Sequence, residues 1–173
     1  NTFLLHLLGW KGLNVDANPR CIEEFKSKRP KDINIHAGVS DREETLPFFN
    51  VGIGLGSSFN EEWVKNIAAK HNRTIHNAQE TYCYPVNTLL EEYLPEGTHI
   101  DVLDIDLEGN DARVIKALDW QKYRPSFVLI EHHADSIQEV LETEFYTNLS
   151  DQGYKIIAYL APTVIFSAST VQP

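Results

Sequence analysis

The sequence predicts an α/β protein with a mostly parallel, doubly wound sheet that helices cover on both faces. Apolar segments of strand length alternate with segments of helical periodicity, and this alternation is typical of parallel sheets. The last two strand segments, Tyr154–Leu160 and Thr163–Ser167, are joined only by Ala161–Pro162, so we expect an antiparallel pair at the C-terminus. A chain of 173 residues with 42% hydrophobic residues is long enough to bury a core. We therefore predict one domain over residues 1–173.

The first half of the chain opens with apolar residues, 1–8, that are typical of the middle of a helix. Leu13 and Val15 then lead into the turn sequence 16–19, which indicates a buried strand. Pro19 favours the first turn of a helix, because its missing N–H costs nothing there. Asn60 can cap another helix. The predicted elements are a strand at 11–18, a helix at 19–28, a strand at 32–39, a short strand at 46–51, a helix at 60–70, a strand at 81–85 and a helix at 86–93.

The second half contains a segment, 99–107, that alternates on a period of two. Asp104 and Asp106 share a face with Ile100 and Val102, so acidic side chains replace apolar ones at the carboxyl end of this strand. The remaining predicted elements are a helix that begins at Asn110 or Asp111 and ends near Trp120, a buried strand at 127–130, a helix with an apolar stripe at 137, 140, 141 and 145, and the closing strand pair.

Composition excludes two classes of partner. The net charge of -10 comes from 25 acidic and 15 basic residues, which leaves no basic surplus for a phosphate backbone, so nucleic acid is not expected. No apolar run approaches the ~20 residues of a membrane span, and we expect a soluble chain. Cys21 and Cys83 lack CxxC spacing, which favours reduced thiols and a cytoplasmic location.

Polar residues end four of the predicted strands. Ligands of open α/β sheets bind beyond the carboxyl ends of the strands, so functional residues are expected there. The four polar ends are 16–18, 40–41, 104–108 and 131–133.

The first two polar ends suit a nucleoside. A carboxylate such as Asp16 can accept hydrogen bonds from both hydroxyls of a ribose, and Ser40 with Asp41 can hold an adenine amino group. The alternative is that Asp16 only orders the turn before Pro19, and that Ser40 and Asp41 form an ordinary turn.

The third polar end gathers negative charge. Asp104, Asp106 and Glu108 are spaced by two, and burying like charges is costly unless a ligand, a metal or a cationic side chain compensates them. Alternatively, Asp106 or Glu108 caps the following helix. Glu131 and His132, at the fourth end, could join Asp104 and Asp106 as ligands of a divalent cation, because carboxylate oxygen and imidazole both bind such ions. A solvated histidine pair, His132 and His133, is the simpler reading.

The glycine-rich run 52–58 is predicted to be a loop that covers the crevice. A phosphate-binding turn should precede the acid of the second strand, whereas this run follows both Asp16 and Asp41. We therefore do not interpret it as a nucleotide-binding fingerprint.

Taken together, five segments resemble the FkbM family of methyltransferases, from about Gly9 to the end of the chain. The most specific feature is the ordered combination of two motifs. The first is a strand that ends in an acid and leads into Asn and Pro, and the second, later in the chain, is a strand that ends in Asp-x-Glu-Gly. The segments are Gly12–Pro19, Gly38–Asp41, Asn87–Leu89, Asp104–Gly109 and Arg124–Glu131.

The resemblance implies a Rossmann-like methyltransferase fold, S-adenosylmethionine as cofactor, and O-methylation of a hydroxyl on a sugar, lipid or secondary metabolite. The acceptor would be a small molecule or a glycan. Asp106 and Glu108 would face the site of methyl transfer as catalytic residues. The cofactor-binding residues would be Asp16 at the ribose, Ser40 and Asp41 at the adenine, and also Asn18 and Asp104.

The sequence departs from the family pattern in two places. Position 104 is usually lysine or serine, and Asp104 adds negative charge that favours a bound cation or a different substrate. The first strand and its glycine-rich loop are expected upstream of Asn1. A non-catalytic binding module without that loop is the alternative, whereas an NAD-dependent oxidoreductase is less favoured because no Tyr-x-x-x-Lys pattern is present.

Overall fold

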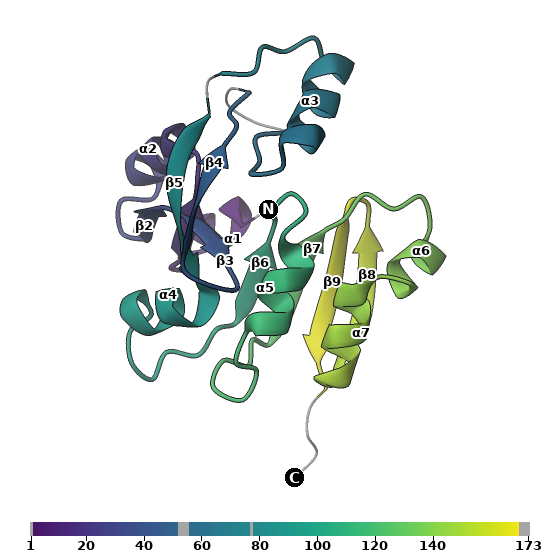
Figure 1. Cartoon of the computed structure of the whole chain (residues 1–173). Helices are drawn as coiled ribbons and strands as arrows, with labels where there is room; N and C mark the ends of the chain where they lie inside the picture. Colours follow the sequence, from purple (N-terminus) through teal and green to yellow (C-terminus); the bar gives the residue numbers. More distant parts are fainter. Residues whose placement is uncertain (1, 52–55, 77, 170–173) are drawn as a thin grey trace. The chain divides into compact units, whose positions relative to one another are not determined.

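The computed structural model describes residues 2–51, 56–76 and 78–169 (Figure 1). The chain forms two compact units. The N-terminal unit comprises Asn1–Leu94 and Leu107–Gly109, and the C-terminal unit comprises Pro95–Asp106 and Asn110–Pro173.

The N-terminal unit contains a two-stranded and a three-stranded sheet. The first pairs β1 with β2 in parallel, and the second has the order β3-β5-β4. Within the second sheet, β3 runs parallel to β5 and β4 runs antiparallel to it. The elements are α1 (Phe3–Leu7), β1 (Leu13–Asp16), α2 (Pro19–Lys28), β2 (Ile33–His36), β3 (Gly38–Ser40), β4 (Glu44–Phe48), α3 (Glu61–Lys70), β5 (Gln79–Pro85) and α4 (Val86–Tyr93).

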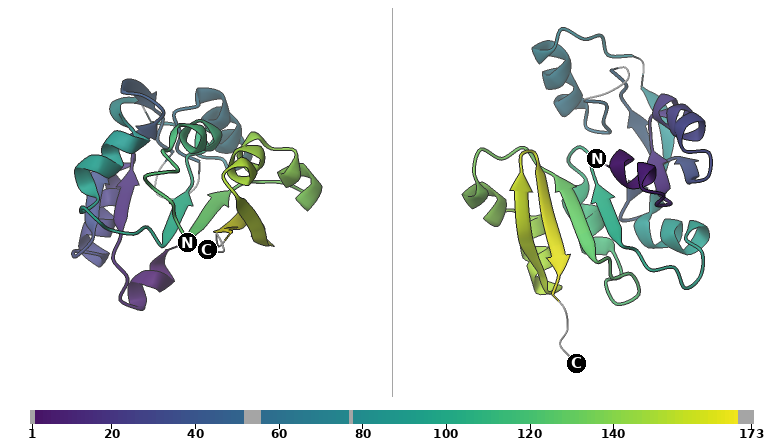
Figure 2. Two further views of the ribbon diagram at one scale, coloured as in Figure 1. Left: turned by 90° about the horizontal axis from the view of Figure 1, so that it is seen from below. Right: turned by 180° about the vertical axis from the view of Figure 1, so that it is seen from behind.

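The C-terminal unit is built on one four-stranded sheet of order β6-β7-β9-β8. Strands β6 and β7 are parallel, and the closing pair β8 and β9 is antiparallel as predicted. Figures 1 and 2 show α5 and α7 on the same face of this sheet. The elements are β6 (Val102–Ile105), α5 (Asp111–Ala117), β7 (Phe127–Glu131), α6 (Ile137–Leu141), α7 (Glu144–Asp151), β8 (Tyr154–Leu160) and β9 (Thr163–Ala168).

The α/β class is therefore confirmed, but the sheet differs from the expectation. In the described part of the chain the strands form three sheets, and three of their six pairings are parallel and three antiparallel. The prediction of a mostly parallel sheet missed the antiparallel return of β4 onto β5. That pairing joins segments about 35 residues apart, and local periodicity carries no information about it.

One predicted strand, 32–39, is two strands. β2 pairs with β1, whereas β3 pairs with β5, and Ala37 lies between them with its N–H donated to the Asp16 carbonyl oxygen at 3.2 Å. The β3–β5 pairing requires glycine at position 38, because a Cβ there would lie 2.5 Å from Cys83 Sγ and 2.7 Å from the Phe59 ring. The change of partner thus coincides with a close approach of the backbone at Gly38 to Cys83 of β5.

The predicted strand 99–107 is shorter than its alternation suggests. β6 ends at Ile105, and Glu108 and Gly109 both have left-handed backbone, with φ of 48° and 104°. Such a conformation cannot continue an extended strand. Asp106 and Glu108 therefore lie in the turn after β6 and do not continue the face of Asp104.

Each unit buries apolar side chains of its own. In the N-terminal unit, Val51, Val64 and Ala68 pack together, with Phe49, Trp63 and Ile75 against them. In the C-terminal unit, fully buried residues lie on the sheet and on α5, α6 and α7, among them Ile115, Val128, Ile130, Val140, Leu149, Val164 and Phe166.

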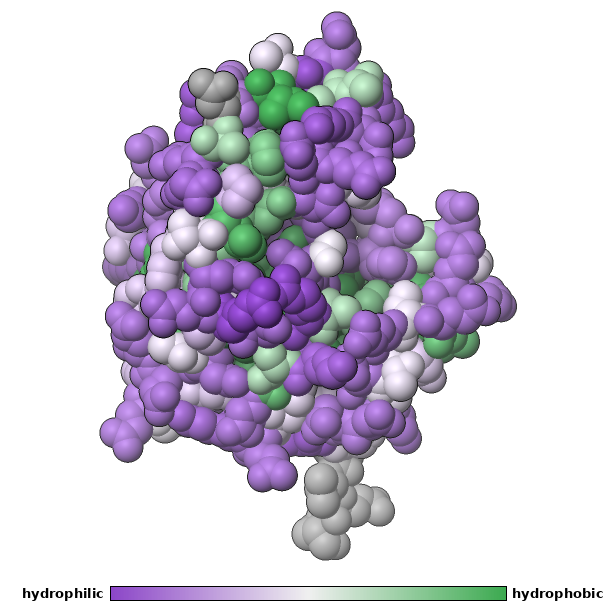
Figure 3. All heavy atoms as spheres, in the orientation of Figure 1, coloured by the Kyte–Doolittle hydropathy of each residue, from purple (hydrophilic) through white to green (hydrophobic). Residues whose placement is uncertain are grey.

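The surface drawn in Figure 3 is largely hydrophilic, as the excess of acidic residues leads one to expect. Helix α1 departs from this pattern, because Leu4 and Leu7 are about two-thirds exposed, at 65% and 64%. Among the described helices, none combines the length and the apolar character that crossing a membrane requires.

Candidate functional site

Asp16 ends β1, and its carboxylate is built into the turn that follows. Asp16 Oδ1 accepts a hydrogen bond of 2.7 Å from the backbone N–H of Asn18. Asp16 thus orders the turn before Pro19, as the simpler interpretation predicted. A carboxylate has about four acceptor positions, so this role does not preclude recognition of a ligand by the same side chain.

Asn18 is the N-cap of α2. Its Oδ1 accepts the backbone N–H of Arg20 at 3.1 Å, and the side chain of Asn50 approaches the same oxygen at 3.5 Å. Asn18 is only 3% exposed. The Asn18 side chain has a structural role, because it accepts a backbone N–H at the start of α2 that would otherwise lack a partner within the helix. The predicted cofactor role of Asn18 stays a prediction.

The surroundings of Asp16 set its ionisation. Burial raises the pKa of Asp16, and the Asn18 N–H, a hydrogen bond from the Cys21 thiol and the nearby His36 act in the opposite direction. Burial together with the Asp16 charge raises the pKa of Cys21 to about 11. Cys21 is therefore a thiol at neutral pH, and its S–H is available to donate to the carboxylate.

His36 stands opposite Asp16 in the β1–β2 register. Its Nε2 lies 3.0 Å from the carbonyl oxygen of Ala17, so the strand that pairs with β1 also holds the backbone of the Asp16 turn. Cys21 and His36 were not singled out from the sequence. Cys21 lies five residues after Asp16, about one helical turn into α2, and that spacing was the available signal.

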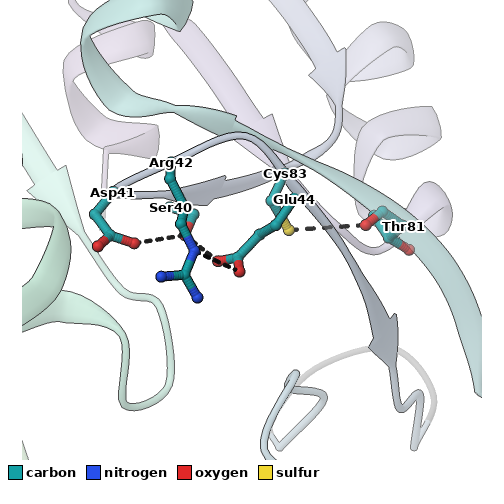
Figure 4. A network of polar contacts seen from close by, with 6 residues as sticks. All are labelled: Ser40, Asp41, Arg42, Glu44, Thr81 and Cys83. Carbon is teal, nitrogen blue, oxygen red and sulfur yellow. Dashed lines mark hydrogen bonds and ion pairs between the residues drawn. The ribbon is translucent and has the colours of Figure 1, made fainter.

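The end of β3 carries a polar network that the sequence showed only in part (Figure 4). The Ser40 hydroxyl lies 2.5 Å from Glu44 Oε1 and 3.2 Å from Asp41 Oδ1. The Arg42 Nε donates to the other oxygen of Glu44 at 3.2 Å. Ser40 is 2% exposed. The predicted pair Ser40 and Asp41 is thus brought together, and Glu44 joins it as a third member.

Glu44 was missed for a topological reason. β3 and β4 are neighbours in sequence but not in the sheet, because β5 lies between them. Ser40 and Glu44 are four residues apart, a spacing that brings side chains together on a helix but does not predict a contact between two strands.

The acidic segment after β6 is divided between the two units. Asp104 lies in β6, half-buried opposite Leu129, and Asp106 follows the strand in the C-terminal unit. Glu108 belongs to the N-terminal unit, where its carbonyl oxygen accepts a hydrogen bond of 3.2 Å from the buried Ser58 hydroxyl. The N-cap position of α5 is Asn110. The left-handed backbone of Glu108 is a strained conformation of the kind that clusters at functional sites.

The predicted loop over the crevice falls mostly outside the described residues, because 52–55 are not among them. At its described end, the Ser57 hydroxyl accepts the N–H of Val51 at 3.1 Å, and Ser58 exchanges backbone hydrogen bonds with Phe49. The Ser58 hydroxyl also donates to the backbone carbonyl oxygen of Glu108. The glycine-rich pattern did not suggest this contact.

The predicted metal site is not formed. Within residues 2–51, 56–76 and 78–169, no three His, Cys, Asp or Glu side chains are gathered as a metal ion would require. Glu131 and His132, the adjacent pair of the predicted ligand set, have other partners. The His132 ring packs edge-on against Phe145 with centroids 5.1 Å apart, and Glu131 Oε1 lies 3.6 Å from His133 Nε2. The grouping of Asp104, Asp106, Glu131 and His132 as metal ligands therefore has no support in the described residues.

Comparison with known proteins gives one match. Residues 1–156 match the family described as Methyltransferase FkbM domain, which is the family that the sequence motifs resemble. No curated protein and no solved structure matches the chain.

The burial of Asp16 predicts a pH-dependent cost to stability. Because its pKa in the folded protein is raised above the ordinary value of 3.8, ionisation of Asp16 lowers the free energy of unfolding as the pH rises through the raised pKa. The Asp16→Asn variant has nearly the same shape but no charge. Its stability relative to the wild type should increase between pH 3.8 and the raised pKa and then level off.

Urea unfolding at a series of pH values measures this difference. The exposed Glu24, on α2, pairs with Lys28 at 2.7 Å, and Glu24→Gln is the matched control that should lack the effect. A difference between Asp16→Asn and the wild type that does not change with pH would contradict the burial of the Asp16 carboxylate.

Proposed function

Because the chain belongs to the FkbM methyltransferase family, we propose that it is an O-methyltransferase that uses S-adenosylmethionine and modifies a hydroxyl on a sugar, lipid or secondary metabolite. The observation that carries this proposal is the half-buried carboxylate of Asp16 at the carboxyl end of β1. It lies at the strand position where dinucleotide and nucleoside sites of α/β sheets place an acid.

Asp16 is proposed to accept hydrogen bonds from the ribose hydroxyls. Burial makes its ionised form costly in the free protein, and new donors from a ligand would offset that cost. The Cys21 thiol and the Asn18 N–H hold the carboxylate in place before the ligand binds. A fixed carboxylate loses less entropy on binding than a mobile one.

Ser40 and Asp41 are proposed to lie beside the adenine. The amino group of adenine is a donor, and a carboxylate such as Asp41 is an acceptor. Asp104 keeps its predicted role as a cofactor residue as part of this proposal.

Asp106 and Glu108 are proposed to serve the acceptor. S-adenosylmethionine supplies a methyl group that is activated by a sulfonium sulfur. The acceptor hydroxyl loses its proton as its oxygen forms the new bond to carbon, and a carboxylate of Asp106 or Glu108 is suited to take that proton. Positioning of the hydroxyl in line with the breaking carbon–sulfur bond would supply much of the remaining rate enhancement.

The cytoplasm is the proposed location, since Cys21 and Cys83 are both free thiols and reduced cysteines are the rule there. A non-catalytic binding module is not favoured, because the match is to a methyltransferase domain over most of the chain.

Calorimetry with S-adenosylhomocysteine tests the cofactor. The protein expressed from its complete reading frame should bind this product at ligand concentrations up to about 1 mM, and Asp16→Asn should bind about 10–100-fold more weakly, the usual loss for hydrogen bonds to a charged group. Glu24→Gln, which changes an exposed carboxylate on the same helix, should bind like the wild type. The proposal fails if the wild type shows no heat of binding.

Release of S-adenosylhomocysteine in the presence of a panel of sugars, glycosides and hydroxylated lipids tests the catalytic pair. Asp106→Asn or Glu108→Gln should lower kcat by about 10²–10⁴, the usual contribution of a general base. The affinity for S-adenosylhomocysteine should change by less than about threefold, or ~0.7 kcal/mol.

The control for the catalytic pair is Asp101→Asn, which changes an exposed acid just before β6. An unchanged kcat in both variants would rule out proton transfer by either carboxylate. Equal losses in kcat and in affinity would instead make the residue a cofactor contact.

A further inference from the structure

We propose that Glu44 is a positioning residue for adenine recognition, which holds Asp41 in place by binding the residues on both sides of it; this inference rests on the proposed function. The Glu44 carboxylate meets the Ser40 hydroxyl through Oε1 and the Arg42 guanidinium through Oε2. Asp41 is the single residue between those two partners (Figure 4).

The order of the strands makes this contact possible. Ser40 stands opposite Pro85, and Glu44 opposite Cys83, on the two strands that flank β5. Positions 83 and 85 are two apart on β5, so their side chains share a face of the sheet. The Glu44 side chain therefore crosses β5 on the same face as Ser40 and joins the two outer strands.

The Ser40 hydroxyl has only one proton to donate. Its oxygen lies 2.5 Å from Glu44 Oε1 and 3.2 Å from Asp41 Oδ1, so the contact with Glu44 is the closer of the two. Glu44 therefore holds the Ser40 hydroxyl, which also contacts Asp41.

The two contacts of Glu44, with Ser40 and with Arg42, differ in how far they are buried. Ser40 is 2% exposed, and the Glu44 side chain is 13% exposed, so their bond is charge-assisted and largely shielded from water. The Arg42 side chain is 68% exposed, and an exposed ion pair contributes little. The bond between Ser40 and Glu44 should therefore supply most of the restraint on the turn.

A restrained Asp41 can distinguish purine bases by what they carry at position 6. The amino group of adenine donates to a carboxylate, whereas the oxo group of hypoxanthine is an acceptor and would face the carboxylate without a proton between them. A site built to hydrogen-bond one group discriminates against an analogue that lacks it. If the turn is loosened, Asp41 can withdraw, and this discrimination should fall.

The experiment compares two probes by calorimetry, S-adenosylhomocysteine and its 6-oxo analogue S-inosylhomocysteine. The wild type should prefer the 6-amino compound by about tenfold or more, as expected for a hydrogen bond to a charged group. Glu44→Ala should reduce that preference to about threefold or less, equivalent to ~0.7 kcal/mol. Glu44→Gln keeps an acceptor oxygen for Ser40 and should restore most of the preference.

Two further variants make the result specific. Ser40→Ala removes the same bond from the other side and should lower the preference as Glu44→Ala does, so the test does not depend on Glu44→Ala being folded. Glu80→Ala removes an exposed carboxylate from β5 and should leave the preference unchanged.

Two outcomes would overturn the inference in distinguishable ways. If Glu44→Ala and Ser40→Ala weaken the binding of both probes equally, the bond between Glu44 and Ser40 has only a structural role, and the proposed cofactor stands. If the wild type binds neither probe, the proposed cofactor fails, and the role of Glu44 fails with it.

Discussion

The hydrogen bond from the Asn18 N–H to Asp16 Oδ1, at 2.7 Å, is the constraint on which the candidate site depends. It fixes the turn between β1 and α2, and Asn18 then caps α2 with its own side chain. The same bond orients a carboxylate whose burial raises its pKa. The turn at residues 16–18 thus starts α2. It also holds the Asp16 carboxylate at the end of β1, where burial makes the ionised form destabilising. Residues that are kept at such a cost are expected where function requires them.

At the end of β3, as at the end of β1, hydrogen bonds order the turn that carries an acidic residue. A carboxylate, here Glu44, binds neighbours on both sides of the residue that would meet the ligand. Asp16 is held by a contact from its own turn, and Asp41 is proposed to be held through the two neighbours that Glu44 binds. Two pre-ordered acceptors, Asp16 and Asp41, suit a nucleoside that presents hydroxyl and amino donors.

Local signals in the sequence predicted local structure well. The helix 19–28 has the predicted ends because Asn18 and Pro19 specify its start, and Asn60 caps α3 as expected. The errors in the strands came from pairings that join distant segments. The split of strand 32–39 reflects a change of partner from β1 to β5. The contact of Glu44 with Ser40 spans only four residues and was still not predicted, and the described residues form no group that could hold a metal ion.

Hydrogen–deuterium exchange with and without S-adenosylhomocysteine tests most directly the claim that the ends of β1 and β3 hold the cofactor. Opening of a turn governs the exchange of its amides, so a ligand that bridges these turns should slow exchange there. The account predicts increased protection in peptides that cover residues 14–22 and 38–45, and none in peptides that cover α3. Binding that is measurable but leaves both segments unprotected would contradict it.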